Sequence, residues 1–300
     1  MASTTTTADP GYGIAPPGYR LPAATRLGAV RLQVADLERS LDWYGRVLGL
    51  EAVDRTAGRV GLAPPGTART LVELHERRGA APVPRRGRLG LYHYALLLPD
   101  RSSLGRFLRH LAELNERAGM SDHLVSEALY LSDPDGLGIE VYADRPRSAW
   151  RHQDRQLAMA TDPLDVESVL AAGGGEPWAG MAAGTVLGHV HLHVDDLDRA
   201  ARFYHTGLGL DRMVWSYPGA LFLAAGGYHH HLGTNTWAAG APLAGENDAR
   251  LLEWEIVLPE AGDVTAAGAS LEQIGVSVES QRGTAAASDP WGTRVRLKTA

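Results

Sequence analysis

The chain has 300 residues, of which 44% are hydrophobic and 21% are charged, and its formal net charge is −6 at pH 7. This composition is typical of a globular protein with room for two domains, and the acidic balance argues against a nucleic-acid-binding protein, whose surface must be basic. The sequence contains no cysteine, so disulfides and thiolate ligands are excluded and a metal site would have to use His, Asp or Glu. No apolar run approaches the roughly 20 residues of a transmembrane helix, and we expect a cytoplasmic protein without a membrane partner.

The N-terminal segment is rich in Thr, Pro and Gly over residues 1–19. It has neither the basic start nor the apolar centre of a signal peptide. We therefore interpret residues 1–25 as a disordered tail that precedes the folded chain.

An internal repeat follows the tail. Residues 34–50 read VADLERSLDWYGRVLGL and residues 194–210 read VDDLDRAARFYHTGLGL, an offset of 160. Each segment follows a short alternating strand, LGAVRLQV or LGHVHLHV, and begins with an Asp-Leu pair that can cap a helix. Each helical pattern ends at a Gly, a common helix C-cap. The repeat therefore predicts a strand and then an amphipathic helix in each half of the chain.

A second, weaker repeat lies inside each half. Residues 92–99 read YHYALLLP and residues 252–259 read LEWEIVLP, again offset by 160. Each half closes with an Asp-Pro-x-Gly turn before a strand, in SDPDGLGIEVY and in SDPWGTRVRL. The chain is thus predicted to contain four β-α-β-β-β modules, near residues 26–76, 90–145, 185–238 and 250–299.

These modules predict an α+β protein in which pairs of modules curl into half-barrels around a cleft. We place a first domain of two modules at residues 26–145 and a second at residues 185–300. A connector at residues 146–184 joins them, with a short helix expected at residues 163–171. Strand residues that point inward from both modules of a pair would line the cleft.

Residues 26–299 resemble the vicinal oxygen chelate superfamily, which includes glyoxalase I, fosfomycin-resistance proteins and type I extradiol dioxygenases. The segments SEALYLSDPDGLGIEVYADRP, GHVHLHVDDL and GGYHHHLGTNTW carry the resemblance, which is closest to four-module catechol 2,3-dioxygenases. The resemblance implies an oxidoreductase of aromatic hydrocarbon catabolism that cleaves the ring of a catechol-type small molecule with O₂.

In this superfamily, metal ligands come from the first and last strands of paired modules. The first-strand positions in this chain are Ala29, His93, His189 and Glu253, and the last-strand positions of modules 2 and 4 are Glu140 and Arg296. An extradiol site needs two His and one carboxylate, with the remaining positions open. Neither pair of consecutive modules supplies this set.

Modules 2 and 3 together supply the complete set, His93, His189 and Glu140. We therefore predict that these two middle modules pair with each other and that they bind Fe(II), for which Mn(II) is an alternative. Modules 1 and 4 would then be a vacated copy, although a second metal near Glu253 stays open.

The resemblance also implies catalytic residues beside the metal. Tyr130 lies ten residues before Glu140, where extradiol enzymes carry a Tyr that binds a substrate hydroxyl, and His123 is the candidate for a His that precedes it. The run Tyr228–Gly233 matches a family pattern similar to Arg-His-His-x-Leu-Ala, which assigns His230 as the acid–base residue. The ordinary pKa of a His suits that role.

Other interpretations of these residues stay open. His189 shares a strand face with His191 and His193, Glu140 could point outward, and the other two histidines of the His229–His231 run could be structural. A glyoxalase-like isomerase or a thiol transferase would use a fourth protein ligand and a non-redox metal. A metal-free small-molecule-binding resistance protein would lack the ligand set, and a homo-oligomer is possible for any of these.

Overall fold

The computed structural model describes residues 11–300, which form four modules of one strand, one helix and three further strands. Module 1 comprises β1 (Arg26–Val34), α1 (Leu37–Arg46), β2 (Glu51–Thr56), β3 (Arg59–Ala63) and β4 (Val72–Glu76). Module 2 comprises β5 (Gly90–Leu97), α2 (Arg101–Glu113), β6 (Gly119–Asp122), β7 (Ser126–Ser132) and β8 (Gly138–Asp144). The predicted α+β class is confirmed.

The second half of the chain repeats this order. Module 3 comprises β11 (Val186–His193), α4 (Leu197–Ala201) continued by the π-helix η2 (Arg202–Gly207), β12 (Asp211–Val214), β13 (Ala220–Ala224) and β14 (Leu232–Asn235). Module 4 comprises β15 (Arg250–Leu258), α5 (Ala261–Gln273), β16 (Glu279–Gln281), β17 (Thr284–Ser288) and β18 (Arg294–Thr299).

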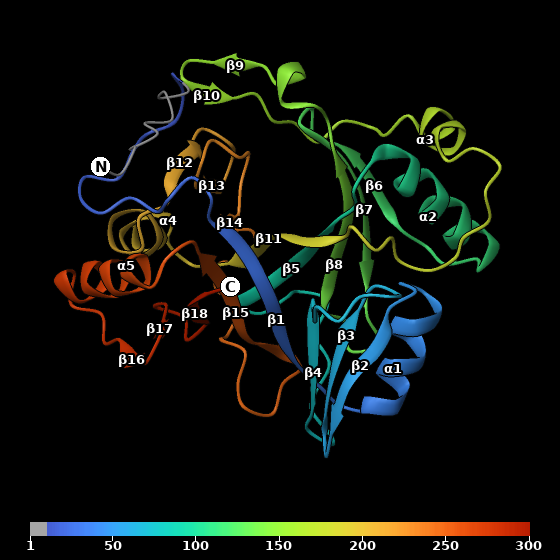
Figure 1. Ribbon diagram of the computed structural model, residues 1–300, viewed down its shortest axis with the longest axis horizontal. Helices are drawn as coiled ribbons and strands as arrows, with labels where there is room; N and C mark the ends of the chain where they lie inside the picture. Colours follow the sequence, from blue (N-terminus) through green and yellow to red (C-terminus); the bar gives the residue numbers. More distant parts are fainter. Residues whose placement is uncertain (1–10) are drawn as a thin grey trace.

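The connector crosses from module 2 to module 3. It contains the 3-10 helix η1 (Arg147–Ala149), the short strands β9 (His152–Gln153) and β10 (Gln156–Leu157), and α3 (Val166–Ala172). The helix predicted at residues 163–171 is confirmed as α3. The strands β9 and β10 pair as a hairpin, which lies over one edge of the 2–3 sheet defined below (Figure 1).

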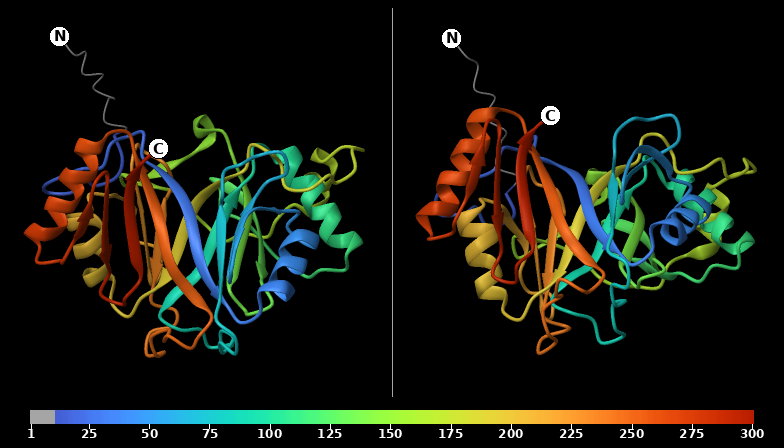
Figure 2. Two further views of the ribbon diagram at one scale, coloured as in Figure 1. Left: turned by 60° about the horizontal axis from the view of Figure 1, so that its bottom comes forward. Right: turned by 90° about the horizontal axis from the view of Figure 1, so that it is seen from below.

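The spatial order of the modules differs from their order in the chain. One sheet, here the 1–4 sheet, has the strand order β16-β17-β18-β15-β1-β4-β3-β2. The other, here the 2–3 sheet, has the order β12-β13-β14-β11-β5-β8-β7-β6. Because β5 and β11 are antiparallel hydrogen-bonded neighbours, the predicted pairing of modules 2 and 3 is confirmed. The two sheets curl into half-barrels, and the helices lie at the two flanks of the molecule (Figure 1, Figure 2).

Short sequence signals fix the helix ends. Asp36 and Asp196 each accept backbone N–H groups from the first turn of the following helix, α1 or α4. Gly49 and Gly209 follow these helices at φ of +63° and +96°, values that other residues adopt only with strain. The longest helices, α2 and α5, have 13 residues, and within residues 11–300 no helix has the length and apolarity of a membrane span.

Two buried tyrosines form equivalent hydrogen bonds between the sheets. Tyr44 of α1 donates to Asp133, in the turn before β8, at 3.2 Å, and Tyr204 of η2 donates to Asp289, in the turn before β18, at 2.7 Å. Each bond joins the helix of one sheet to a turn of the other. The sheets also touch through their central strands, where β1 contacts β11 and β5 contacts β15.

The predicted disordered tail of residues 1–25 is wrong for residues 11–25. Arg20 donates two hydrogen bonds to Asp211, at 2.7 and 2.8 Å, and the segment adds an isolated bridge to β12. The composition gives no hint of this order, because the order comes from partners on module 3. Residues 1–10 lie outside the described residues.

Each half of the chain, residues 26–145 and 185–300, contributes one module to each sheet. A half therefore does not correspond to one sheet, and the division of the chain into two domains at these boundaries stays a prediction.

Candidate metal centre

The middle of the 2–3 sheet brings three predicted ligands together. His93 lies on β5, Glu140 on β8 and His189 on β11, which are adjacent strands. Across the sheet, His189 is paired with Ala95 and Ala95 is paired with Glu140, while His93 lies two residues before Ala95. Alternate residues of a strand point to one face, so all three side chains share a face, and the small Ala95 side chain leaves room between them.

The three ligand atoms form a nearly equilateral triangle. The Nε2 atoms of His93 and His189 are 3.3 Å apart, and they lie 3.0 and 3.1 Å from Oε2 of Glu140. Metal–donor bonds of about 2.1 Å at right angles separate neighbouring donors by about 3 Å. The triangle therefore has the size of one face of an octahedron, which leaves the opposite face for other ligands.

Burial and charge make this group suitable for a cation. Burial lowers the pKa of His189 to about 4, although Glu140 opposes this shift, so the imidazole is neutral at pH 7. Burial alone would raise the pKa of Glu140, but the facing His189 and His93 outweigh burial and hold this pKa well below its usual value. A buried carboxylate is costly unless it is paired or metal-bound.

This donor set fits a divalent ion such as Fe(II) or Mn(II), because both accept two imidazoles and one carboxylate. His93, Glu140 and His189 are 4%, 2% and 1% exposed. Within residues 11–300, no other group of His and carboxylate side chains is close enough to hold a metal ion.

Tyr130 and His123 form a hydrogen-bonded pair beside the ligands. Tyr130 on β7 is paired across the strands with Glu140, so it points to the same face. His123 places Nδ1 2.6 Å from the carbonyl oxygen of Ala160, and its Nε2 contacts the Tyr130 hydroxyl. Because a carbonyl only accepts, Nδ1 of the neutral imidazole donates and Nε2 accepts from Tyr130. Burial and Glu140 raise the pKa of Tyr130 well above its usual value, so the phenol stays protonated.

His230 ends a hydrogen-bonded chain that begins at Asp144. Oδ1 of Asp144 is 2.9 Å from Nε2 of His229, and Nδ1 of His229 is 2.7 Å from Nδ1 of His230. A carboxylate only accepts, so His229 donates through Nε2 and accepts at Nδ1, and His230 donates through Nδ1. Burial and the neighbouring histidines lower the pKa of His230 well below its usual value. The neutral imidazole thus keeps a lone pair on Nε2, and His230 lines the cavity in front of the ligands.

The other histidines of β11 bind elsewhere. Asn235 places its Nδ2 3.0 Å from Nε2 of His191 and its Oδ1 2.7 Å from Nδ1 of His193. Neither His191 nor His193 belongs to the metal-binding group. Of the three histidines on this face of the strand, His189 is the one that converges with the predicted ligands.

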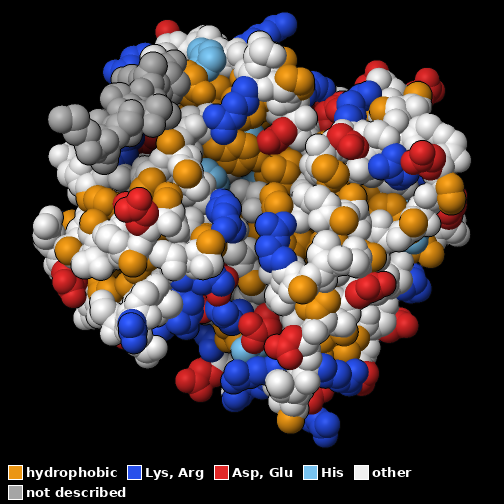
Figure 3. Space-filling view, in the orientation of Figure 1, with side chains coloured by type: hydrophobic (Ala, Val, Ile, Leu, Met, Phe, Trp, Pro, Cys, Tyr) orange, Lys and Arg blue, Asp and Glu red, His pale blue; other side chains and the backbone are white. Residues whose placement is uncertain are grey.

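A cavity of about 230 Å³ lies in front of the ligand group. Its polar lining residues include His93, Glu140, Tyr130 and His230. The remaining wall is largely apolar and aromatic, and includes Tyr92, Met159, Ala160, Tyr217, Phe222 and Trp237. Hydrophobic side chains line the hollow on this side of the molecule (Figure 3). The size and lining suit a single aromatic ring.

The 1–4 sheet has no ligand set at the corresponding place. Its equivalent positions hold Ala29 for His189, Glu253 for His93 and Arg296 for Glu140. The sequence analysis left open a second metal near Glu253. Within residues 11–300 the carboxylates of this sheet form no metal-binding group.

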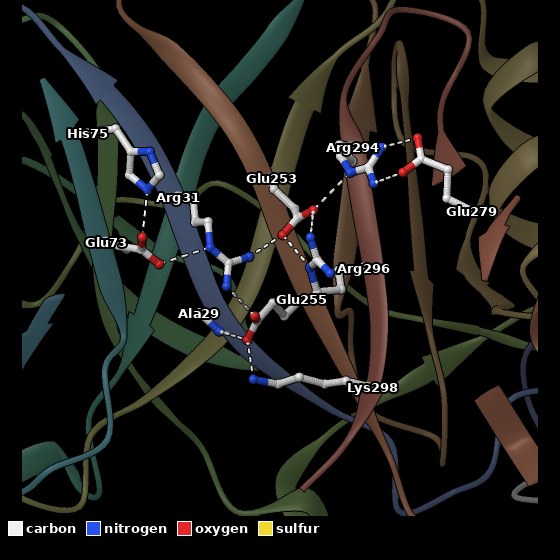
Figure 4. A network of polar contacts seen from close by, with 10 residues as sticks. All are labelled: Ala29, Arg31, Glu73, His75, Glu253, Glu255, Glu279, Arg294, Arg296 and Lys298. Atoms are coloured by element: carbon white, nitrogen blue, oxygen red, sulfur yellow. Dashed lines mark hydrogen bonds and ion pairs between the residues drawn. The ribbon is translucent and has the colours of Figure 1, made fainter. Parts of the chain in front are cut away.

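An ion-pair network occupies that place in the 1–4 sheet (Figure 4). Arg31 donates to Glu73 at 2.9 Å and to Glu255 at 2.7 Å, and it also pairs with Glu253. Lys298 adds a second cation to Glu255 at 2.7 Å. The guanidinium of Arg31 therefore balances the charge of the buried carboxylates Glu253 and Glu255 in this sheet.

Asp144 and His229 are candidate functional residues that the sequence analysis missed. The signal for Asp144 is the two-residue period of β8, which puts Glu140, Tyr142 and Asp144 on one face. The signal for His229 is its place next to His230, but a run of three His does not reveal which ring nitrogens meet.

The fold and this site define a class of protein. The sequence profile of the Glyoxalase/Bleomycin resistance protein/Dioxygenase superfamily matches residues 26–141 and 186–297. The chain belongs to this superfamily. A catechol-2,3-dioxygenase from Bacillus subtilis strain 168 is 42% identical over 270 residues, which are 89% of this chain and 94% of that protein. The chain is therefore a dioxygenase-type enzyme, similar to a catechol-2,3-dioxygenase over most of its length.

Solved structures share the fold. A candidate dioxygenase from Bacillus subtilis aligns with a TM-score of 0.63 at 13% identity, covering 94% of this chain and 86% of that one. Glyoxalase I from Zea mays aligns with a TM-score of 0.55 at 18% identity, covering 92% of each chain. The predicted family and the predicted half-barrel fold are thus confirmed.

Proposed function

We propose that the chain is an Fe(II)-dependent extradiol dioxygenase. It would cleave the ring of a catechol next to the two hydroxyls with O₂ and give a product of the 2-hydroxymuconic semialdehyde type. The observation that carries the proposal is the buried group of His93, Glu140 and His189, two of which, His93 and Glu140, line a cavity with the size of one aromatic ring. The 42% identity to a catechol-2,3-dioxygenase supports the substrate class and a role in aromatic catabolism.

His93, Glu140 and His189 would hold the metal, which is Fe(II) in this proposal; Mn(II) is the alternative that the same donors accept. When bound, the metal would supply Lewis acidity toward the catechol hydroxyls and the redox capacity that a reaction with O₂ requires. The aromatic and apolar wall would hold the ring and exclude water, which strengthens the electrostatic interactions of the site.

His230 would act as the acid–base residue. His230 lines the cavity, and the tautomer set by His229 leaves the lone pair on Nε2. His230 would therefore accept a proton from a catechol hydroxyl and return it later in the reaction. Asp144, acting through His229, would keep Nδ1 of His230 protonated and would stabilise the imidazolium that forms.

Tyr130 would bind a substrate hydroxyl. Its own proton points to His123, so its oxygen would accept a hydrogen bond from the substrate. His123 would fix this orientation, because its Nδ1 is held by the Ala160 carbonyl of the connector.

The test is O₂ uptake with catechol after anaerobic loading with Fe(II), and separately with Mn(II). We expect one O₂ per catechol and a yellow product in the near-visible. Glu140→Gln should bind no stoichiometric Fe(II) and should lose activity by about 100-fold or more, since it removes the one anionic ligand. Glu253→Gln is the matched control, because this buried carboxylate lies in the 1–4 sheet, and it should keep the metal.

Two results would overturn the proposal. One is a fully active Glu140→Gln variant. The other is an Fe(II)-loaded protein that consumes no O₂ with any catechol tested, and activity with Zn(II) or Ni(II) without O₂ would then favour an isomerase or a thiol transferase.

A further inference from the structure

A second, larger cavity of about 800 Å³ adjoins the metal centre. The two cavities share four lining residues, namely Tyr92, His93, Tyr130 and Trp237. One of these is the proposed metal ligand His93, and another is the proposed substrate partner Tyr130. A group attached to a ring at the metal centre would therefore reach the second cavity directly.

Two aromatic rings stand where the cavities meet. The register between β5 and β11 shifts at Tyr92, and such a bulge re-aims a side chain. The Tyr92 ring lies 5.7 Å from that of Trp237 in an edge-to-face arrangement. Both side chains are partly exposed, at 37% and 50%. Because both rings line both cavities, a short methylene chain that runs from one cavity to the other would contact them.

Three arginines line the second cavity, and none of them lines the first. Arg85 and Arg86 lie in the loop between β4 and β5, and Arg117 lies in the loop after α2. These three side chains form no ion pair or hydrogen bond within residues 11–300. Glu116 is the single carboxylate in the lining. Unpaired guanidinium groups present the fork of donors that binds a carboxylate in two parallel hydrogen bonds.

The inner cavity has the opposite character. Its lining contains no Arg or Lys, and its one carboxylate is the proposed ligand Glu140. An anionic substituent would find no Arg or Lys partner there, and in the proposed complex the catechol hydroxyls occupy the metal, whereas the second cavity offers three guanidinium groups. A charged substituent is therefore favoured only in the second cavity.

We propose that the preferred substrate is a catechol whose side chain ends in a carboxylate. The catechol ring would occupy the inner cavity, the side chain would pass Tyr92 and Trp237, and the carboxylate would bind at Arg85, Arg86 and Arg117. This inference rests on the proposed function for the ring, but the carboxylate subsite can be tested by binding alone.

The experiment compares 3-(3,4-dihydroxyphenyl)propionate with its methyl ester, which has a neutral side chain of similar length. We expect kcat/KM for the acid to exceed that for the ester by about tenfold. This factor corresponds to one charge-assisted hydrogen bond between the carboxylate and an arginine. Anaerobic titration of the metal-loaded protein should give the same ratio in Kd. The acid preference should shrink at 0.5 M NaCl, because salt screens exposed charges.

The triple variant Arg85→Gln, Arg86→Gln, Arg117→Gln should bring the acid-to-ester ratio close to one, in kcat/KM and in Kd. The control is Arg59→Gln. Arg59 lines a cleft of the 1–4 sheet, and its replacement removes a positive charge that lies outside the second cavity. This control should keep the ratio.

The outcomes separate the two proposals. Equal constants for acid and ester, or an equal loss of the ratio in Arg59→Gln, would overturn the carboxylate subsite while ring cleavage stands. An acid preference in Kd that disappears in the triple variant would support the carboxylate subsite even if no ring were cleaved. The absence of ring cleavage would then contradict the proposed function alone.

Discussion

The proton on His230 depends on a carboxylate two hydrogen bonds away. Asp144 sets the tautomer of His229, and His229 sets that of His230. An isolated imidazole would exchange freely between its two tautomers, and only one of them offers a base to the cavity. The side chain of Asp144 is 25% exposed, so it also connects the buried pair to solvent.

Asp144→Asn should therefore lower kcat without loss of metal. An amide that turns its NH₂ toward His229 reverses both tautomers and puts the proton on Nε2 of His230. We expect a fall in kcat of about 10- to 100-fold, within the range of lost acid–base catalysis, while the bound Fe(II) stays stoichiometric and KM changes little. Steady-state kinetics and metal analysis of one preparation measure both quantities.

Tyr228→Phe is the control for this variant. Tyr228 also donates to Asp144, at 3.3 Å, but it does not lie between Asp144 and His230. It should keep most of kcat. If Asp144→Asn retained full kcat, or lost metal in proportion to activity, the positioning role of Asp144 would be refuted.

At the residue scale, the sequence predicted individual site residues better than the hydrogen bonds that connect them. His93, Glu140 and His189 stand out because the resemblance names their strands, and the structure brings them together. Asp144 does not stand out, because its role depends on a ring orientation that only packing determines.

Among the elements, the segment of residues 11–25 shows how tertiary partners override composition. Arg20 is 46% exposed at its side chain, but its partner Asp211 is only 4% exposed. The segment also reaches the connector, since Gly13 donates to the carbonyl of Arg155 at 2.7 Å. It thus holds the hairpin of β9 and β10, whose following residues line the inner cavity.

Arg20→Ala should destabilise the protein, because it leaves the Asp211 carboxylate buried without its cation. We expect a loss of about 1–2 kcal/mol, seen as a fall in Tm of a few degrees for a chain of this size. Thermal unfolding of Arg20→Ala, Asp211→Asn and the double variant forms a cycle in which the second change should cost less than additivity predicts. Additive losses would show that this pair does not anchor the segment.

The sequence predicted most other elements, because Asp caps, Gly stops and the two-residue strand period are local signals. It did not predict that the helix of module 3 continues as the π-helix η2 where module 1 has a regular α-helix. The two repeats agree at Asp36 and Asp196 and at Gly49 and Gly209, so the difference is not visible in those signals.

At the scale of the whole molecule, the order of modules follows from the ligand set and not from chain order. Modules 1 and 2 together lack a complete set of metal ligands, and so do modules 3 and 4. This absence predicted that the middle modules pair with each other, and the strand order confirms it. The links from Tyr44 to Asp133 and from Tyr204 to Asp289 were not predicted, because each joins two sheets whose contact no local pattern encodes. Both aspartates, Asp133 and Asp289, are buried.

The Asp133 link should make folding stability fall as the pH rises. Burial raises the pKa of Asp133 from 3.8 to about 7. Between these values the folded chain binds a proton that the unfolded chain has released. The stability that protonated Asp133 contributes is therefore complete below about pH 4 and is lost as the pH rises toward 7. Burial shifts the pKa of Asp289 in the same direction, to about 6.

Asp133→Asn removes this pH dependence, because the amide is neutral throughout. Relative to the unmodified protein, the variant should gain stability as the pH rises from 5 toward 7, by about 1.4 kcal/mol for each pH unit, and the gain should level off above pH 7. Thermal unfolding at pH 5, 6, 7 and 8 measures this gain as a rising difference in Tm. Tyr44→Phe keeps the carboxyl group and should retain the pH dependence. If Asp133→Asn and the unmodified protein instead kept a constant difference in Tm, Asp133 would be ionised in the folded chain, and its two backbone hydrogen bonds, from Asp135 and Leu137 at 2.9 Å each, would outweigh its burial.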